Sequence, residues 1–266
     1  MTADDQSPIK IDVGVSAKAE IKAEIPTASM GRLVDALTDA IRPFTEGRGL
    51  RADLIRLQRE EVALEVVRRA KKRIALEQMD VRPIPLKILV PLLEQASLEE
   101  PESELIEKWS ELLVSACAAA DISINWCVQI LAVIDSWQAR TLDKLAAAET
   151  NFSLFEVDNY TRGNVDADFA NWLAILSHTP SESIRRRLSD VPGFNMFFDG
   201  DNIPNTEMFY MNGLFEGSRL QHLDALGLVW VNAARFRNNK NRYFLLNARL
   251  TPLGYEFVQA CQGNAD

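Results

Sequence analysis

The stretch that decides the fold lies at residues 82–109 and reads RPIPLKILVPLLEQASLEEPESELIEKW. Pro83 and Pro85 favour extended backbone in the residues before them, so we expect the chain to enter a helix near Leu86. Pro91 lies one to two turns into that helix and is expected to kink or interrupt it. The segment therefore predicts an extended elbow followed by a helix.

A second helix is predicted to follow, because Ser97 and Glu100 have the spacing of a capping box. Its start could equally lie at Ser103. Hydrophobic residues then recur at helical spacing in two sets, namely Leu105, Trp109, Leu112, Leu113 and Ala116, and Ile124, Cys127, Val128, Leu131 and Ile134. These sets predict two antiparallel helices, and residues 137–148 predict a third.

The same segment resembles the Abi-alpha family, a bacterial group associated with abortive infection, which is defence against phage at the cost of the infected cell. The resemblance rests on four short motifs, IPLK at 84–87, PLLE at 91–94, ASLEE at 96–100 and WxxLLxxA at 109–116. It extends to the charged segment 50–75 and to residues 220–228 and 250–261, and leaves residues 150–205 unmatched. The resemblance implies a helical fold and a role in phage defence, and no motif in it is catalytic in type.

Composition limits the possible function classes. The 266 residues are 47% hydrophobic and carry a net charge of −9, which predicts a soluble chain of two domains. This charge argues against indiscriminate attraction to nucleic acid or anionic membrane, so any such contact must be local. In the helical region, the longest stretch without charge or strong polarity, residues 112–120, is far shorter than the roughly 20 residues of a spanning helix. We therefore expect no transmembrane helix.

The three cysteines indicate a reducing compartment. Cys117, Cys127 and Cys261 lie in apolar helical contexts without a CxxC pair, which predicts buried, reduced thiols rather than disulfides or a zinc site. The N-terminal sequence MTADDQSPIK has no apolar core and is not a secretory signal. Both observations predict a cytoplasmic protein.

Residues 1–28 form a segment of their own. Apolar and polar residues alternate over positions 7–26, which is typical of a strand. The strand could pair across a homo-oligomer, form a weak hairpin, or stay disordered. Next comes a helix capped by Ser29, whose apolar stripe comprises Met30, Leu33, Val34, Leu37 and Ile41. With the helices above, it makes residues 29–149 a predicted helical bundle.

A long charged helix is predicted over residues 50–78, with Val62, Val66, Ala70 and Ile74 on one side. Residues 68–73 place five cations in six positions, which could bind nucleic acid or an acidic partner. Glutamates at 60, 61 and 65 favour the alternative of a solvated face with ion pairs across helical turns. The helix is too long and charged for one small bundle to cover, so we expect a homo-oligomer.

Acidic residues crowd the first helix of the bundle at positions 99, 100, 102, 104, 107 and 111. They lack a histidine partner and the spacing of a calcium loop, so we interpret them as solvated acids. Residues 150–205 are richer in Gly, Asn and Asp and are interpreted as a junction. Within the junction we expect helices at 166–177 and 182–188. Phe194, Phe197 and Phe198 are expected to fill a groove between the two halves.

Residues 206–262 have the element order of a winged-helix-like α+β domain. A helix ends at Gly227, a strand follows at 228–231, a turn-rich extension at 232–241, and a returning strand at 243–246. Thr251 caps a last helix. The predicted fold class is thus mainly α, with an N-terminal helical bundle and a C-terminal winged-helix-like α+β domain.

The C-terminal part holds the strongest binding signal. No acidic residue lies between Asp224 and Glu256, whereas five cations do, namely Arg235, Arg237, Lys240, Arg242 and Arg249. The candidate binding residues are Arg219, Arg235, Arg237, Lys240 and Arg242, with an acidic protein or a nucleic-acid backbone as partner. Only Arg219, Gln221 and His222 could read bases from the preceding helix, which argues against sequence-specific DNA binding.

The chain has two histidines, His178 and His222. Neither histidine belongs to a catalytic or metal-binding motif, and the glycines are scattered, so we predict no enzyme, no cofactor and no metal site. The predicted function is a non-catalytic phage-defence protein that acts through protein interactions and oligomerisation. The alternative is a winged-helix DNA-binding regulator. A third hypothesis, a membrane-damaging effector, lacks the positive charge that would direct it to a membrane.

Overall fold

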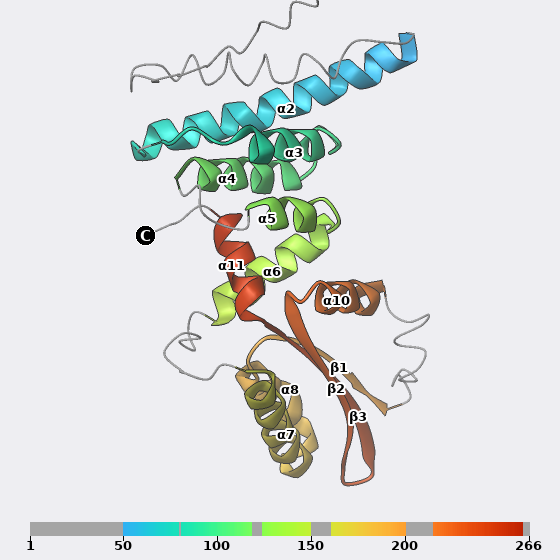
Figure 1. Cartoon of the computed structure of the whole chain (residues 1–266). Helices are drawn as coiled ribbons and strands as arrows, with labels where there is room; N and C mark the ends of the chain where they lie inside the picture. Colours follow the sequence, from blue (N-terminus) through green and yellow to red (C-terminus); the bar gives the residue numbers. More distant parts are fainter. Residues whose placement is uncertain (1–49, 80, 119–123, 150–160, 201–214, 263–266) are drawn as a thin grey trace, which may run out of the picture.

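The computed structural model describes residues 50–79, 81–118, 124–149, 161–200 and 215–262 (Figure 1). Over these ranges the chain is mainly α-helical, with a helical N-terminal part and a C-terminal α+β part that holds a three-stranded sheet. The predicted fold class is confirmed at this level. The alternating segment 1–28 and the stripe beginning at Met30 lie outside the described residues.

The long helix α2 (Leu50–Glu77) forms as predicted and buries Val62, Val66, Ala70 and Ile74. Helix α3 (Leu86–Ala96) follows the Pro83–Pro85 elbow and runs through Pro91 without interruption. The expected break is absent because α3 buries Leu89, Leu92 and Leu93, and this packing offsets the hydrogen bond that a proline removes.

Helix α4 (Leu105–Ala118) begins at the later of its two predicted positions. The backbone N–H of Leu105 donates to Ser103 Oγ at 3.2 Å, so Ser103 caps this helix. Ser97 instead follows the end of α3, and its hydroxyl donates to the carbonyl oxygen of Glu94 at 2.7 Å. The chain between the two serines is a short turn region.

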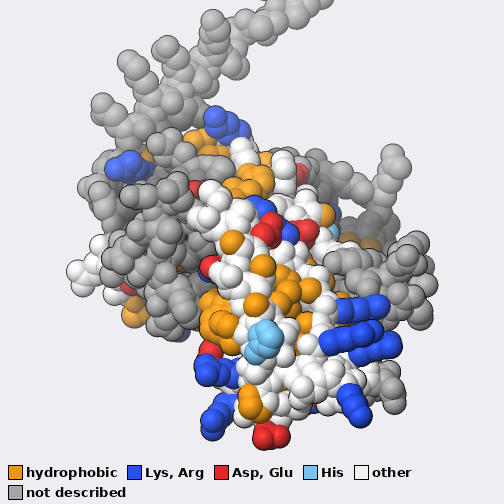
Figure 2. All heavy atoms as spheres, turned by 90° about the horizontal axis from the view of Figure 1, so that it is seen from below, with side chains coloured by type: hydrophobic (Ala, Val, Ile, Leu, Met, Phe, Trp, Pro, Cys, Tyr) orange, Lys and Arg blue, Asp and Glu red, His pale blue; other side chains and the backbone are white. Residues whose placement is uncertain are grey.

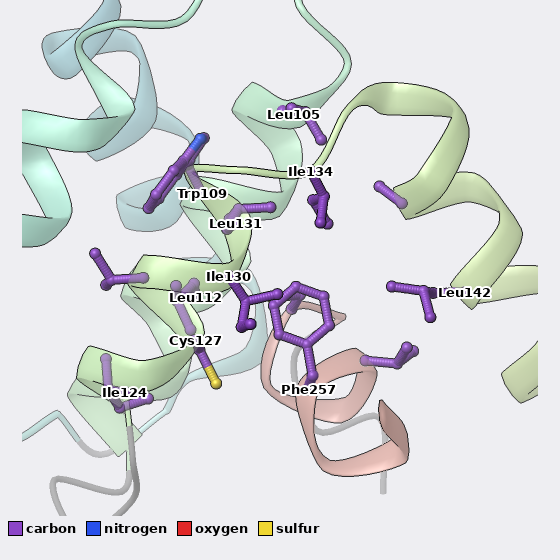
Figure 3. Packing of buried hydrophobic residues seen from close by; sticks show 14 of the residues in the cluster. Leu105, Trp109, Leu112, Ile124, Cys127, Ile130, Leu131, Ile134, Leu142 and Phe257 are labelled. Atoms are coloured by element: carbon purple, nitrogen blue, oxygen red, sulfur yellow. The ribbon is translucent and has the colours of Figure 1, made fainter. Parts of the chain in front are cut away.

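Helices α5 (Ile124–Leu131) and α6 (Ser136–Glu149) complete the bundle, and the predicted apolar stripes are buried. Trp109 is fully buried. Trp126 is partly buried and meets the ring of Phe257 edge to face, with centroids 6.2 Å apart. Figure 3 shows Phe257 of the last helix, α11 (Pro252–Ala260), among side chains of α5 and α6. One hydrophobic core therefore continues from the bundle into the C-terminal part.

The sheet has the strand order β1-β3-β2, with both pairs antiparallel. Its strands are β1 (Phe194–Asp199), β2 (Val229–Asn238) and β3 (Asn241–Leu250). The prediction of a turn-rich extension over 232–241 is wrong, because only Asn239 and Lys240 lie between the two long strands. Asn239 has a φ of 54°, the left-handed conformation that asparagine tolerates in tight turns.

Both faces of the sheet are covered, which is why β3 is buried from Tyr243 onward. Helices α6, α10 (Phe215–Ala225) and α11 pack on one face. Helix α7 (Arg162–His178) packs on the other face. After α7 come the short helix α8 (Ile184–Arg187) and two 3-10 turns, Ser181–Ser183 and Leu188–Asp190.

The predicted junction therefore contributes a strand and a covering layer to the sheet. The helix expected at 166–177 is part of α7, and the phenylalanines expected in a groove belong to β1. Phe194 meets the ring of Trp137 in the bundle at 6.1 Å, whereas Phe197 stacks on Tyr243 at 5.4 Å on the opposite face. Alternation along β1 divides these rings between the two faces.

Candidate functional site

Four predicted binding residues lie together on the β2–β3 hairpin, and we call them the basic hairpin surface: Arg235, Arg237, Lys240 and Arg242. All four side chains are exposed. Arg237 is directly opposite Arg242 in the register, Arg235 lies two residues before Arg237 on the same face, and Lys240 is in the turn. Like charges placed opposite each other destabilise a strand pair, so the hairpin carries them at a cost to its own stability.

The basic side chains project from the face of the hairpin that α10 covers further along. Arg235 pairs with Phe244, and Phe244 belongs to the core shared with the bundle. Alternation then places Phe236 and Tyr243 on the opposite face, where their rings stack at 5.3 Å. The cations thus occupy the end of a face whose inner part is core.

The hairpin is fixed next to its turn. The side-chain amide of Asn238 is buried and donates to the carbonyl oxygen of Leu176, at 2.9 Å, and to that of Thr179. Both carbonyls lie at the C-terminal end of α7, and that of Leu176 also accepts from the backbone N–H of Thr179 at 3.2 Å. Together with the stacked rings, these bonds hold the hairpin in one position, which lowers the entropy cost of binding through it.

Arg219 is placed in a different environment from the other four. Its Nε lies 2.8 Å from Asp135 Oδ2, and its guanidinium lies 5.4 Å from the centre of the Trp137 ring. His222 Nδ1 lies 3.1 Å from the amide nitrogen of Gln138. Two of the three predicted base readers on α10 therefore contact the bundle.

The partner of α10 is the first turn of α6, which is capped reciprocally. Asp135 Oδ1 accepts from the backbone N–H of Gln138 at 2.8 Å, and Gln138 Oε1 accepts from the backbone N–H of Asp135 at 2.9 Å. The Gln138 amide also donates to the carbonyl oxygen of Arg219 at 2.8 Å. One capping box thus orients α10 on the bundle, a role that its sequence spacing alone does not reveal.

Arg249, counted among the C-terminal cations from the sequence, is buried. Its Nη1 lies 3.2 Å from Asp168 Oδ2, so it joins β3 to α7. The sequence pattern could not separate Arg249 from the exposed cations, because the partner carboxylate lies 81 positions away in the chain.

A second basic group was missed by the sequence analysis, although three consecutive arginines at 185–187 were a visible signal. Arg185 Nη2 lies 3.0 Å from Asp199 Oδ2, and its guanidinium lies 5.7 Å from the centre of the Phe197 ring. Arg186 is exposed and makes no ion pair with the described residues. Figure 2 shows basic side chains on both sides of this end of the molecule, with hydrophobic side chains and a histidine between them.

The cations of α2 are largely engaged within the helical part. Glu65 pairs with Arg68 and Arg69, and Arg69 also reaches Glu107 on α4 at 2.9 Å. The hydrogen bond that Arg69 donates to Glu65 lowers the pKa of Glu65. The same hydrogen bond raises the pKa of Arg69. This agrees with the interpretation of residues 68–73 as an ion-paired face.

The thiols are buried as predicted. Burial raises the pKa of Cys117 and of Cys127 to about 11, and it raises the pKa of Cys261 well above its ordinary range. Such thiols are poor nucleophiles near neutral pH. In the described ranges, no cluster of three or more His, Cys, Asp or Glu side chains could hold a metal ion. None of the described helices is long and apolar enough to cross a membrane.

The sequence model of one family, described as Abortive infection alpha, matches residues 58–261. That range contains every described element from α3 to the end of α11 and most of α2. The chain belongs to the Abortive infection alpha family. No curated protein and no solved structure matches it.

Membership in the Abortive infection alpha family bears out the resemblance stated from the motifs at 84–116 and 250–261. It also includes residues 150–205, which those motifs left unmatched. The matched range takes in α7, β1 and the whole basic hairpin surface, so the covered sheet and its cations are part of the family region.

Proposed function

We propose that this Abortive infection alpha protein protects bacterial cells against phage by binding an acidic protein partner, without catalysis, through the basic hairpin surface. We further propose that it acts in the cytoplasm as a homo-oligomer. The observation that carries the proposal is the placement of Arg237 opposite Arg242 at the end of a fixed hairpin. In a chain of net charge −9, carboxylates from a partner would relieve the repulsion within this cluster.

A protein partner is favoured over a nucleic acid by the position of α10. Groove recognition normally uses a helix whose side chains reach base edges. Here Arg219 and His222 contact Asp135 and Gln138 of the bundle. A cationic hairpin with an engaged helix beside it suits a carboxylate-bearing surface better than a DNA groove.

The test is a phage challenge of cells that express the full chain. Reversing all four cations of the basic hairpin surface to glutamate is expected to abolish protection, because the variant repels an acidic partner. Arg186→Glu is the matched control, since Arg186 is also exposed but lies on α8. Circular dichroism should show an unchanged fold for both variants. Full protection by the fourfold variant would contradict the proposal.

A second candidate function is a winged-helix DNA-binding regulator, which is favoured by the order α10, β2, hairpin turn, β3 and α11. We expect wild-type protein to bind neither duplex nor single strands at about 50 mM salt, where phosphate contacts are strong. If the protein binds nucleic acid, and this binding weakens steeply with added salt and is lost in the fourfold variant, the partner of the basic hairpin surface is nucleic acid. A preference of the protein for one DNA sequence would identify it as a DNA-binding regulator.

A further inference from the structure

The outward face of α2 carries hydrophobic side chains that the described part of the structure leaves uncovered. Leu54, Leu57, Leu64 and Leu76 are 69, 60, 45 and 72% exposed, respectively. Leu54, Leu57 and Leu64 lie on the side of the helix away from the buried Val66, and Leu76 lies at the edge of that side, next to a hollow that Glu107 and Glu111 of α4 also line. Glu61 and Arg68 continue the same stripe at spacings of three and four residues. We call these six residues the outer α2 face.

The middle of the outer α2 face is self-complementary when it is reversed. From the N-terminal end the face reads leucine, leucine, acid, leucine, base, leucine, with Leu64 near its centre and the exposed Lys72 between Arg68 and Leu76. A second α2 laid antiparallel would bring Leu64 against Leu64, Glu61 against Arg68, Leu54 against Leu76, and Leu57 against Lys72. A parallel pair in register would instead set Glu61 against Glu61 and Arg68 against Arg68, and like charges would oppose it.

We propose that the outer α2 face pairs with the outer α2 face of a second copy of this chain, antiparallel, about a twofold axis at Leu64. The proposal rests on the homo-oligomer of the proposed function and identifies its interface. Such a twofold contact uses the same surface on both copies and closes as a dimer. The stretch from Leu54 to Leu76 extends about 33 Å along the helix, which gives a long seam of leucines, interrupted by Lys72, with an ion pair on each side of its centre.

The two charged residues are available for this contact. Glu61 is exposed and makes no ion pair with the residues that the structure describes. The side chain of Arg68 is 77% exposed and touches Glu65 through one terminal nitrogen. A guanidinium has five N–H donors, so this contact leaves donors for a carboxylate of the second copy.

Charge exchange tests the pairing in the full chain. Wild-type protein at tens of micromolar is expected to scatter light with twice the 29.9 kDa mass of one chain. Glu61→Arg alone and Arg68→Glu alone should each weaken the dimer about tenfold or more, because each creates like-charge pairs at two places. The double variant should recover the dimer. An equimolar mixture of the two single variants should form a heterodimer, because opposite charges then meet at both places.

Cross-linking tests the position of the twofold axis. Leu64→Cys should form a disulfide-linked dimer under air oxidation with a copper catalyst, because the axis places the two Cys side chains together. Leu76→Cys alone should not, since its counterpart is Leu54 of the other copy, but a mixture of Leu54→Cys and Leu76→Cys chains should cross-link. The native thiols are buried and provide little background.

The outcomes separate the interface from the function on which it rests. A wild-type mass of 29.9 kDa would overturn both the oligomer and this interface, and would assign the outer α2 face to another occupant. A dimer that is indifferent to both single charge variants and gives no Leu64→Cys cross-link would overturn the interface alone. Neither result would change the phage test of the proposed function, because that test depends on the basic hairpin surface and not on the outer α2 face.

Discussion

At Glu111 the fold buries a carboxylate, and its ionisation is linked to stability. The side chain is 7% exposed, Oε1 lies 3.3 Å from Arg73 Nη1, and Oε2 has no hydrogen-bond partner among the described residues. Burial raises the pKa of Glu111 above its ordinary 4.5, and Arg73 opposes that rise. Between the ordinary and the raised pKa, the folded state therefore keeps a proton that the unfolded state releases. The stability of the folded state falls as the pH rises through this range.

We expect the urea midpoint of unfolding to fall as the pH rises from 4.5 towards neutral. Glu111→Gln should reduce that slope, because glutamine does not titrate in this position. Glu102→Gln is the control, since Glu102 is exposed on the same part of the chain and should keep the wild-type slope. An unchanged pH dependence in Glu111→Gln would show that the buried carboxylate is not responsible.

Trp109 tests the packing of the bundle. It is fully buried, and its indole N–H donates to Glu99 Oε1 at 3.1 Å. Trp109→Ala should lower the free energy of unfolding by about 3–5 kcal/mol, the usual cost of emptying a large buried site. Leu98→Ala, at an exposed position, should change it by less than about 0.5 kcal/mol. Equal urea midpoints for the two variants would place Trp109 outside the core.

The acids of the first bundle helix show what the sequence could not supply at this scale. They were interpreted together as solvated acids, yet Glu99 bonds to Trp109 and Ser103, and Glu111 is buried against Arg73. Their spacing along the chain was visible, although only Glu107 and Glu111 lie on α4. Which of them faces α2 depends on how two helices pack, and side-chain chemistry along one helix does not determine that.

At the element scale, Gly254 sets how closely α11 approaches the sheet. A Cβ added there would lie 2.0 Å from the carbonyl oxygen of Leu228. Gly254→Ala should therefore displace α11 and destabilise the protein by about 1–3 kcal/mol or more. Gly163→Ala in α7 is the matched control, because its Cβ would meet only Thr161 Oγ1 at 3.9 Å. That change should leave stability equal or raise it by up to about 1 kcal/mol.

Amphipathic helices could be predicted from the sequence, whereas a strand covered on both sides was predicted only in part, since the strand expected at 243–246 is the middle of β3. The helices α2, α4, α5 and α6 were recognised because each has one buried stripe at helical spacing. β3 reads NRYFLLNARL and β1 reads FNMFFD, without strict alternation. β3 is covered on both faces, so its buried run is continuous and hides the period of two.

The candidate site could also be predicted only in part, because the sequence shows local charge but not long-range contacts. The exposed cations Arg235, Arg237, Lys240 and Arg242 were found from local charge alone, because a solvated strand end keeps its polar pattern. The roles of Arg219 and Arg249 depend on Asp135 and Asp168, which are far away in the sequence. Long-range ion pairs of this kind are formed by the fold and leave no local signature.

At the scale of the whole molecule, the bundle and the C-terminal part share one core. Phe257 of α11 meets Trp126 of α5, Ser115 Oγ donates to the carbonyl oxygen of Ala260 at 2.7 Å, and Arg219 pairs with Asp135. Removing the C-terminal part would uncover the apolar side chains around Phe257 (Figure 3). We therefore expect the two parts to unfold together, because neither keeps its core without the other.

Hydrogen exchange in increasing urea measures this coupling. The backbone amides of α4 in the bundle and of β3 in the sheet should lose protection at the same urea concentration, since both are released only by global unfolding. Phe257→Ala should lower that concentration equally for both elements, because it empties their common core. Leu253→Ala on the same helix, at an exposed position, should leave it nearly unchanged. Loss of protection in β3 at a clearly lower concentration than in α4 would instead divide the molecule into two independently folding domains.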